Sequence, residues 1–297
     1  MQPNLYIQKI EDVYTNNKSV DLSILRLDKL HPIVSGNKYF KLKYFIEEAI
    51  LKEKKSVATF GGYYSNHLHA AAYACRENGI QSIGYIKGHP PKVLNDTLKD
   101  CIKFGMELKF IPHHSYDQIQ NELQKDIADD TLFIPMGGYD SRGMKGASEI
   151  LDFEGVSAYD YIIAAAGTGT MAAGLLLKLN SLQKLVVFSS INNNESLKNE
   201  ICFLDNALIE KKDQLDLQFD FHFGGYAKSN QSLFDTMNWF YDQHGIPTDF
   251  VYTGKMISGF YSLLQTGYFK SGSKILLIHS GGLQGNRSIE HGKLNFQ

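Results

Sequence analysis

The chain of 297 residues carries 30 Lys or Arg and 32 Asp or Glu, so its formal net charge is -2 and no basic block suggests a nucleic-acid surface. The length favours two domains, no apolar run approaches the roughly 18 residues of a membrane span, and residues 1–14 carry no signal-peptide core. Because Cys75, Cys101 and Cys202 are too far apart for a disulfide framework or a zinc pair, we expect a cytoplasmic protein that binds a small charged molecule rather than a metal, nucleic acid or membrane.

The first predicted helix begins near Lys38, and its apolar positions Leu42, Phe45, Ile46 and Ala49 lie on one face. Lys38 shares this face because it lies four residues before Leu42 and seven before Phe45. Burial would lower the pKa of its amine and leave a neutral nucleophile suited to Schiff-base chemistry. A lysine at a helix end that reaches water along its methylene stem would show the same pattern.

After this helix, short apolar runs alternate with helix-length periodic segments. The first series predicts strands at residues 57–60, 82–86, 107–111 and 131–134, with helices near 66–78, 95–104 and 116–127. The second series predicts strands at residues 161–165, 184–188, 249–251 and 274–279. This alternation is typical of parallel sheets covered by helices. We expect a large domain of residues 1–43 and 153–297, into which a smaller domain of residues 44–152 is inserted.

Glycine clusters follow four of the predicted strands, namely Gly61-Gly62, Gly137-Gly138, Gly167-x-Gly169 and Gly281-Gly282. A single cluster of this kind usually forms only a tight turn. In α/β folds, however, ligands bind at the carboxyl ends of the strands. Four clusters at equivalent strand ends therefore predict one shared cleft.

The segment 166–174 follows a buried strand and opens a helix. The free backbone N–H groups, the helix dipole and the hydroxyls of Thr168 and Thr170 suit a phosphate monoester. The motif Gly167-x-Gly169-x-x-Ala172 also matches a dinucleotide fingerprint, which would favour an oxidoreductase. The next strand nevertheless ends in Ser189-Ser190 rather than in the acid that binds a ribose hydroxyl.

The segment 61–67 is a second loop before a helix, and Ser65 or Asn66 can cap that helix. Its N–H groups could bind a substrate carboxylate, with both side chains reaching the reacting atoms. His67 and His69 lie two residues apart and do not face each other on a helix, so we do not expect a zinc pair. Tyr252 is the remaining candidate for proton transfer.

Together these segments resemble the family of 1-aminocyclopropane-1-carboxylate deaminases and D-cysteine desulfhydrases. Gly36-Asn37-Lys38 with Lys41-Leu42 is similar to the family's cofactor-lysine motif, segment 61–67 to its substrate-carboxylate loop, and segment 167–174 to its phosphate loop. The resemblance covers nearly the whole chain. It implies an α/β fold of two parallel open-sheet domains with three αβα layers, related to the tryptophan synthase β subunit. It also implies a pyridoxal 5'-phosphate cofactor, a small amino-acid substrate and a homodimer.

The resemblance also implies roles for individual residues. Lys38 would bind the cofactor covalently, Asn66 would lie near its ring hydroxyl, and Thr253 would lie beside its pyridine nitrogen. The implied phosphate ligands are Gly167, Thr168, Gly169 and Thr170. The implied substrate site contains Ser65, Asn66, His67, Tyr226, Tyr252 and Ser280. Ser65 would lie near the reacting centre, and either Lys38 or Tyr252 would move the α-proton.

The choice of expected substrate depends on Thr253. In the family, a glutamate at this place accompanies cyclopropane deaminases and a threonine accompanies D-cysteine desulfhydrases. A carboxylate stabilises a protonated pyridinium, which is a strong electron sink, whereas a hydroxyl only shares a hydrogen bond with a neutral nitrogen. We therefore expect a D-cysteine desulfhydrase that forms pyruvate, sulfide and ammonia. A 1-aminocyclopropane-1-carboxylate deaminase that forms 2-oxobutanoate is the alternative, and a non-catalytic ligand-binding protein on the same scaffold is the more distant one.

Overall fold

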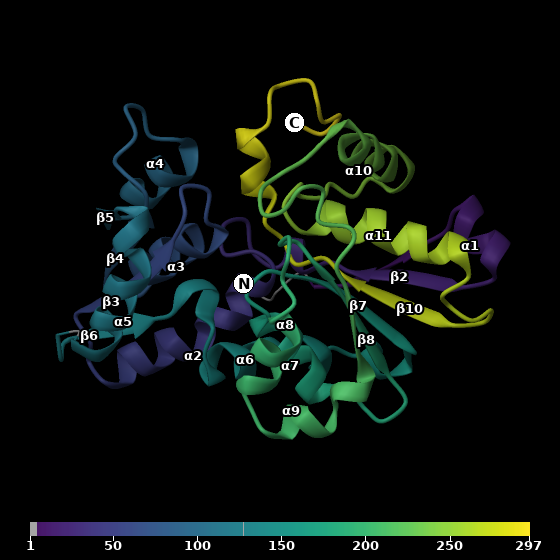
Figure 1. Cartoon of the computed structure of the whole chain (residues 1–297), viewed down its shortest axis with the longest axis horizontal. Helices are drawn as coiled ribbons and strands as arrows, with labels where there is room; N and C mark the ends of the chain where they lie inside the picture. The colour runs from purple at the N-terminus through teal and green to yellow at the C-terminus, as the bar shows by residue number, and fades with distance from the viewer. Residues whose placement is uncertain (1–4, 127) are drawn as a thin grey trace.

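The computed structural model describes residues 5–126 and 128–297. Within these residues the chain forms two lobes, each built on one sheet (Figure 1). The larger sheet has the strand order β1-β2-β10-β7-β8-β9, and the smaller has the order β5-β4-β3-β6. None of the described helices is both long enough and apolar enough to cross a bilayer.

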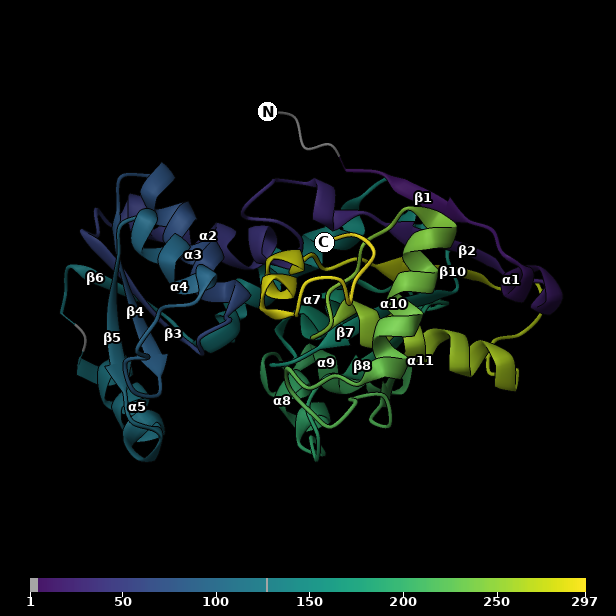
Figure 2. The same ribbon diagram turned by 90° about the horizontal axis from the view of Figure 1, so that it is seen from above.

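The larger sheet lies between two layers of helices, and Figure 2 shows it from above. Its strands are β1 Ile7–Ile10, β2 Asp21–Leu25, β7 Tyr161–Ala166, β8 Lys184–Ser189, β9 Leu215–Gln218 and β10 Lys274–Ile278. All neighbouring strands are parallel except β1 and β2. Alternate residues of β7 face opposite cores, Ile162 on one side and Ile163 on the other, as the pleat requires.

The helices of this lobe divide between the two cores. One core is covered by α1 Val13–Lys18, α10 Gln231–His244 and α11 Thr253–Thr266. The other is covered by α6 Ser141–Ser148, α7 Thr170–Lys178, α8 Leu197–Phe203 and α9 Ala207–Glu210. The predicted three-layer αβα arrangement of a parallel sheet is therefore confirmed, with an antiparallel edge strand added.

The smaller sheet is entirely parallel. Its strands are β3 Ser56–Gly61, β4 Gln81–Lys87, β5 Met106–Ile111 and β6 Thr131–Ile134. The helices α2 Asn37–Leu51, α3 Asn66–Glu77 and α4 Asp96–Lys103 pack on one face through a shared apolar core. Helix α5 Tyr116–Asp126 packs on the other face through a core that contains Phe60 and Tyr116.

The predicted strand at 249–251 is wrong. The carboxylate of Asp249 accepts hydrogen bonds from the N–H groups of Val251 at 3.0 Å, Tyr252 at 2.9 Å and Thr253 at 2.9 Å. These contacts bend the chain into the start of α11, because a side chain that satisfies the first N–H groups of a helix favours the helix over a strand.

Helix α2 contributes to both lobes. Its Phe40 packs in the core of the large sheet, whereas Phe45 and Ala49 pack in the core of the small sheet. The chain therefore passes from one lobe to the other within α2, and Lys38 lies at this junction. The domain boundaries expected at 43/44 and 152/153 stay a prediction.

Candidate active site

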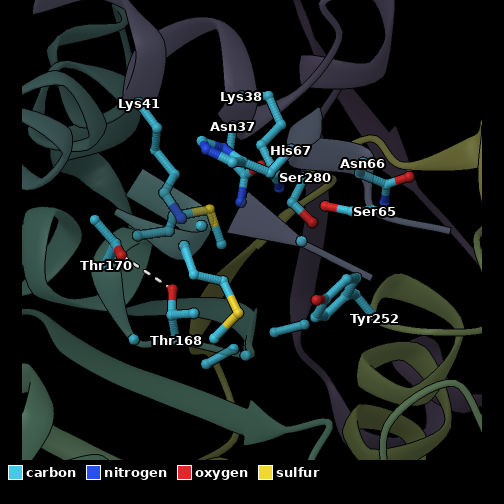
Figure 3. A pocket seen from close by; sticks show the side chains of 18 of the residues that line it. Asn37, Lys38, Lys41, Ser65, Asn66, His67, Thr168, Thr170, Tyr252 and Ser280 are labelled. Carbon is cyan, nitrogen blue, oxygen red and sulfur yellow. Dashed lines mark hydrogen bonds between the residues drawn. The ribbon is translucent and has the colours of Figure 1, made fainter. Parts of the chain in front are cut away.

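A cavity of about 310 Å³ lies where the carboxyl ends of both sheets meet, and Figure 3 shows the side chains around it. All four glycine clusters contribute to its wall through Gly61, Gly62, Gly137, Gly167, Gly169 and Gly281. The structure also brings together nine side chains singled out from the sequence, which are Lys38, Ser65, Asn66, His67, Thr168, Thr170, Tyr226, Tyr252 and Ser280. The expected shared cleft is therefore present.

Lys38 lines the cavity from the first turn of α2. The side chain is half-buried because it faces the cavity, and its Nζ donates to Asn37 Oδ1 at 2.8 Å. Burial lowers the pKa of its amine to about 8, and the negative charge of Asp249 opposes part of this shift. Near neutral pH a usable fraction of the amine is therefore uncharged and nucleophilic.

Gly36 fixes the start of α2 against the end of β10. It has a φ of +65°, and a Cβ atom at this position would lie 1.9 Å from the carbonyl oxygen of Ser280. Only glycine allows both the left-handed backbone and this close approach. The same contact brings Ser280 to the wall beside Lys38.

The loop between β7 and α7 forms the opposite wall. Gly169 precedes α7 with a φ of +78°, and the hydroxyls of Thr168 and Thr170 lie 3.0 Å apart. The first N–H groups of a helix have no partner within the helix and carry a partial positive charge. This wall can therefore hold a phosphate group.

Lys41, which the sequence analysis named only as part of the cofactor-lysine motif, is a site residue whose role was not predicted. It is 4% exposed, lines the cavity and extends toward the two threonines in Figure 3. Within the described part of the chain its Nζ has no hydrogen bond or ion pair. Burial, and next the charge of Lys38, hold the pKa of this amine well below its ordinary value. Its spacing of three residues from Lys38, one helical turn away, was the available signal.

The unpaired amine of Lys41 indicates that the cavity suits a phosphorylated cofactor. A buried amine without a counter-ion is unfavourable, and a bound dianion would stabilise its charged form. The threonine hydroxyls, the N–H groups of α7 and Lys41 supply hydrogen bonds and charge of the right sign on one side of the cavity. The residues present therefore fit pyridoxal phosphate, with Lys38 available for its aldehyde.

The loop between β3 and α3 also begins a helix at the cavity. Ser65 is the N-cap of α3, and its Oγ accepts from the N–H of Leu68 at 3.2 Å. The side-chain oxygen of Asn66 accepts a hydrogen bond from Gln284 Nε2. The N–H groups of this helix start are suited to a carboxylate, although the expected contact of Asn66 with a cofactor ring stays a prediction.

His67 is buried and uncharged. The Thr59 hydroxyl donates to the Ile134 carbonyl at 2.8 Å, so it accepts from His67 Nε2 at 2.9 Å. The Nδ1 atom then carries no proton, and it has no partner among the described residues. Burial first, and then Lys41 and Lys38, hold the pKa of this imidazole well below its ordinary value.

Tyr252 and Tyr226 form a pair at the cavity. Their rings are T-shaped, with centroids 6.2 Å apart, and the two phenols interact. Burial, followed by the contact with Tyr226, raises the pKa of the Tyr252 phenol well above its ordinary value. Tyr252 is therefore protonated and suited to donate a proton rather than to accept one.

Thr253 is not among the described residues of the cavity wall, and its expected place beside the ring nitrogen stays a prediction. The residue is fully buried. Its hydroxyl donates to Asp249 Oδ1 at 2.6 Å and accepts from the N–H of Asp249 at 2.7 Å. Asp249 therefore holds this hydroxyl within the turn that leads into α11. No Asp or Glu is found among the described residues of the wall.

Comparison with known proteins supports the cofactor assignment. The profile of a family described as pyridoxal-phosphate dependent enzyme matches residues 14–281. A Thermotoga maritima protein named putative 1-aminocyclopropane-1-carboxylate deaminase is 27% identical over an alignment of 305 positions, gaps included. The alignment covers 95% of this chain and 94% of that protein. A Klebsiella pneumoniae D-cysteine desulfhydrase is 22% identical, with 88% of this chain and 87% of that protein covered.

Solved structures agree with these similarities. The crystal structure of a homologue of 1-aminocyclopropane-1-carboxylate deaminase has a TM-score of 0.80 at 27% identity, covering 95% of this chain and 90% of that chain. A pyridoxal 5'-phosphate-dependent aspartate racemase has a TM-score of 0.70 at 13% identity, covering 100% and 93%. The second similarity is one of fold alone.

Proposed function

The chain belongs to the family of pyridoxal-phosphate-dependent enzymes, and on this premise we propose that it is a D-cysteine desulfhydrase, which converts D-cysteine and water to pyruvate, sulfide and ammonia. The observation that carries the proposal is the cavity wall itself. It combines a lysine whose amine has a pKa of about 8 with a threonine-lined helix start and the unpaired Lys41. These groups are what an amino-acid lyase with a phosphorylated aldehyde cofactor needs.

In this proposal the cofactor is held at two points. Lys38 Nζ would hold its aldehyde carbon, while Thr168, Thr170, Lys41 and the N–H groups of α7 would hold its phosphate. When bound, the cofactor supplies an electron sink that acidifies the α-hydrogen of an amino acid joined to it. Asn66, at the start of α3, would lie beside its ring hydroxyl.

The protein's own side chains would move the protons. Lys38 is the base, because its lowered pKa leaves a neutral amine that can accept the α-proton. Tyr252 is the acid, because its raised pKa keeps the phenol protonated until it donates to the leaving sulfur. The N–H groups after Gly62, with the hydroxyl of Ser65, would hold the substrate carboxylate. The single ring N–H of His67 is donated to Thr59, so His67 would line this part of the site without donating to the carboxylate.

The absence of a carboxylate among the described residues of the wall favours D-cysteine over the cyclopropane substrate. Asp249 is the nearby acid, but its oxygens are occupied by the N–H groups at the start of α11 and by Thr253. Without a carboxylate at the ring nitrogen, the electron sink is the weaker one. Expelling a thiolate needs less electron withdrawal than opening an unactivated carbon ring.

The relatives support the alternative activity. Proteins from Thermotoga and Pyrococcus that are 26% to 29% identical are named putative 1-aminocyclopropane-1-carboxylate deaminases. The decisive experiment offers D-cysteine, L-cysteine and 1-aminocyclopropane-1-carboxylate separately and identifies the keto acid. We expect pyruvate and sulfide from D-cysteine, and none with Lys38→Ala. If 2-oxobutanoate from the cyclopropane acid were the sole product, the preference for D-cysteine would be wrong. The cytoplasmic location and the homodimer also stay predictions.

A further inference from the structure

Lys255 is a buried charge to which the proposed reaction assigns no task. It is 1% exposed and lies in the first turn of α11, three residues after Tyr252. Its Nζ donates to the carbonyl oxygen of Gly225 at 2.7 Å and forms no ion pair with any described carboxylate. Burying an ammonium group is unfavourable unless its hydrogen bonds are well placed. This bond to a single carbonyl therefore calls for an explanation.

The carbonyl belongs to a loop, residues 222–228, whose backbone is unusual. Phe223, Gly224, Gly225 and Ala227 all have φ between +51° and +115°. The loop contributes two hydrogen bonds of its own at Gly225, whose N–H donates to the His222 carbonyl at 3.0 Å and whose carbonyl accepts from Lys228 at 3.1 Å. Left-handed backbone at the non-glycine positions is unfavourable and persists only where outside contacts enforce it.

The outside contacts act at three points of this loop. Phe223 and Ala227 pack at its two ends against an apolar cluster that includes Phe234. Between them, Lys255 is the charged group that holds the middle of the loop. The next residue after Gly225 is Tyr226, which is 48% exposed, lines the cavity and packs against Tyr252.

We propose that Lys255 is a positioning residue that holds Gly225 so that the hydroxyl of Tyr226 stays against that of Tyr252. The start of α11 then positions both phenols. Tyr252 is the N-cap of this helix, and Lys255 in its first turn holds the loop that carries Tyr226. The kinetic part of this inference rests on the proposed function, whereas the structural part does not. Lys255 acts through Tyr226 and is not itself on the cavity wall.

The structural test is hydrogen exchange of the loop in cofactor-free Lys255→Met. Methionine has similar length and an apolar end, so it can fill the buried site without the charge. We expect the amides of residues 222–228 to exchange about tenfold faster, because one charge-assisted hydrogen bond is lost. The matched control is Lys211→Met. Lys211 Nζ also donates to backbone carbonyls, those of Leu177 at 2.7 Å and Leu179 at 2.8 Å, but away from the cavity.

The kinetic test is a double-mutant cycle with Tyr226→Phe. We expect Lys255→Met to leave cofactor affinity unchanged and to lower kcat on the order of 10²-fold, as for a misplaced reacting group. In the Tyr226→Phe background, Lys255→Met should lower kcat little further, because the hydroxyl through which Lys255 acts is already absent. The proposal would be overturned if the effects of the two substitutions on kcat multiplied in the double variant. It would also be overturned if Lys255→Met changed neither the hydrogen exchange of the loop nor kcat.

These experiments distinguish a failure of the inference about Lys255 from a failure of the proposed function. If Lys255→Met fails to fold, Lys255→Gln, which keeps a donor on a shorter stem, is measured in its place, and unchanged loop exchange again overturns the inference. If the wild-type protein turns over neither D-cysteine nor the cyclopropane acid, the proposed function fails. Loop exchange then decides the role of Lys255 on its own.

Discussion

Two amines on one face of α2 have different partners in this cavity. Lys38 has the Asn37 amide oxygen and the field of Asp249, whereas Lys41 has no partner among the described residues. The first is therefore prepared to react, and the second is prepared to bind an anion. Their separation by one helical turn also makes each amine less easily protonated when the other is charged.

The lowered pKa of Lys38 predicts the pH dependence of its reactivity. In the cofactor-free protein, the neutral amine forms as the pH rises through about 8, rather than near its ordinary value of 10.5. The rate of acylation of Lys38, followed by peptide mass spectrometry, should rise through pH 8 and then level off. A rate that still rises steeply above pH 10 would show that this amine is not desolvated.

Lys41 should contribute to cofactor affinity through the phosphate alone. Charge-assisted hydrogen bonds contribute about 1.5 to 3 kcal/mol, so Lys41→Met should weaken pyridoxal phosphate binding by roughly ten- to a hundredfold. Pyridoxal, which lacks the phosphate, serves as the control in the same fluorescence titration. Equal weakening of both compounds would place Lys41 away from the phosphate.

At the scale of elements, four helix starts surround the cavity. Helices α2, α3, α7 and α11 begin at Asn37, Asn66, Thr170 and Thr253. Each of these starts contributes its first residues or its N-cap to the wall. The N–H groups at the start of α11 already bind the carboxylate of Asp249. Helix N-termini attract anions, so the starts of α3 and α7 favour a ligand with more than one negative group. A phosphorylated cofactor and an amino-acid carboxylate together meet this description.

The junction at Gly36 predicts a large effect of a small substitution. Gly36→Ala adds a Cβ atom that would lie 1.9 Å from the Ser280 carbonyl, in addition to the strain of a φ of +65°. We expect the free energy of unfolding to fall by at least about 2 kcal/mol in urea titrations. Gly79→Ala is the control, because Gly79 has a φ of +68° and nothing within 4 Å of the added atom. Equal losses in the two variants would mean that the contact with Ser280 is unimportant.

At the scale of the whole molecule, the two lobes are also joined beside the cavity. The segment after β10 reaches the small lobe, where Thr97 Oγ1 donates to Gln284 Oε1 at 2.9 Å and Arg287 pairs with Asp100. Gln284 in turn donates to Asn66. The loop proposed to bind the substrate carboxylate is therefore held from both lobes, and a ligand in the cavity would contact both.

Cofactor binding should consequently stabilise both sheets together. At a cofactor concentration about 100 times Kd, linkage adds about 2.7 kcal/mol to the free energy of unfolding. Hydrogen exchange should slow in peptides that contain β3 and β4 as well as in those that contain β7 and β8. Protection confined to one sheet would contradict a site shared between the lobes.

Much of this architecture could be predicted because the central strands are short apolar runs that end in glycine. The strands β1, β2 and β9 were not predicted, since polar residues such as Lys9, Ser23 and Asp216 interrupt their apolar pattern. The segment after Asp249 looked like a strand because its residues are apolar. The structure shows that a side-chain acceptor, which periodicity does not register, converts it into a helix start.

Some site residues could likewise be identified from the sequence, and others could not. Lys38 and the threonine loop could be identified from local pattern, because their chemistry depends on the segment that carries them. The roles of Lys41 and Lys255 depend on tertiary contacts, namely an unpaired buried amine and a bond to a distant carbonyl. Such contacts have no signature within a short stretch of sequence.

The central claim is that Lys38 is the amine that holds the cofactor. The most direct measurement incubates the protein with pyridoxal phosphate, reduces the adduct with borohydride and locates the added mass by peptide mapping. We predict a single modified peptide that carries the group on Lys38, and its loss in Lys38→Ala. The same cavity contains Lys41 and Lys87. Modification of either of these in the wild-type protein, with Lys38 unmodified, would contradict the account.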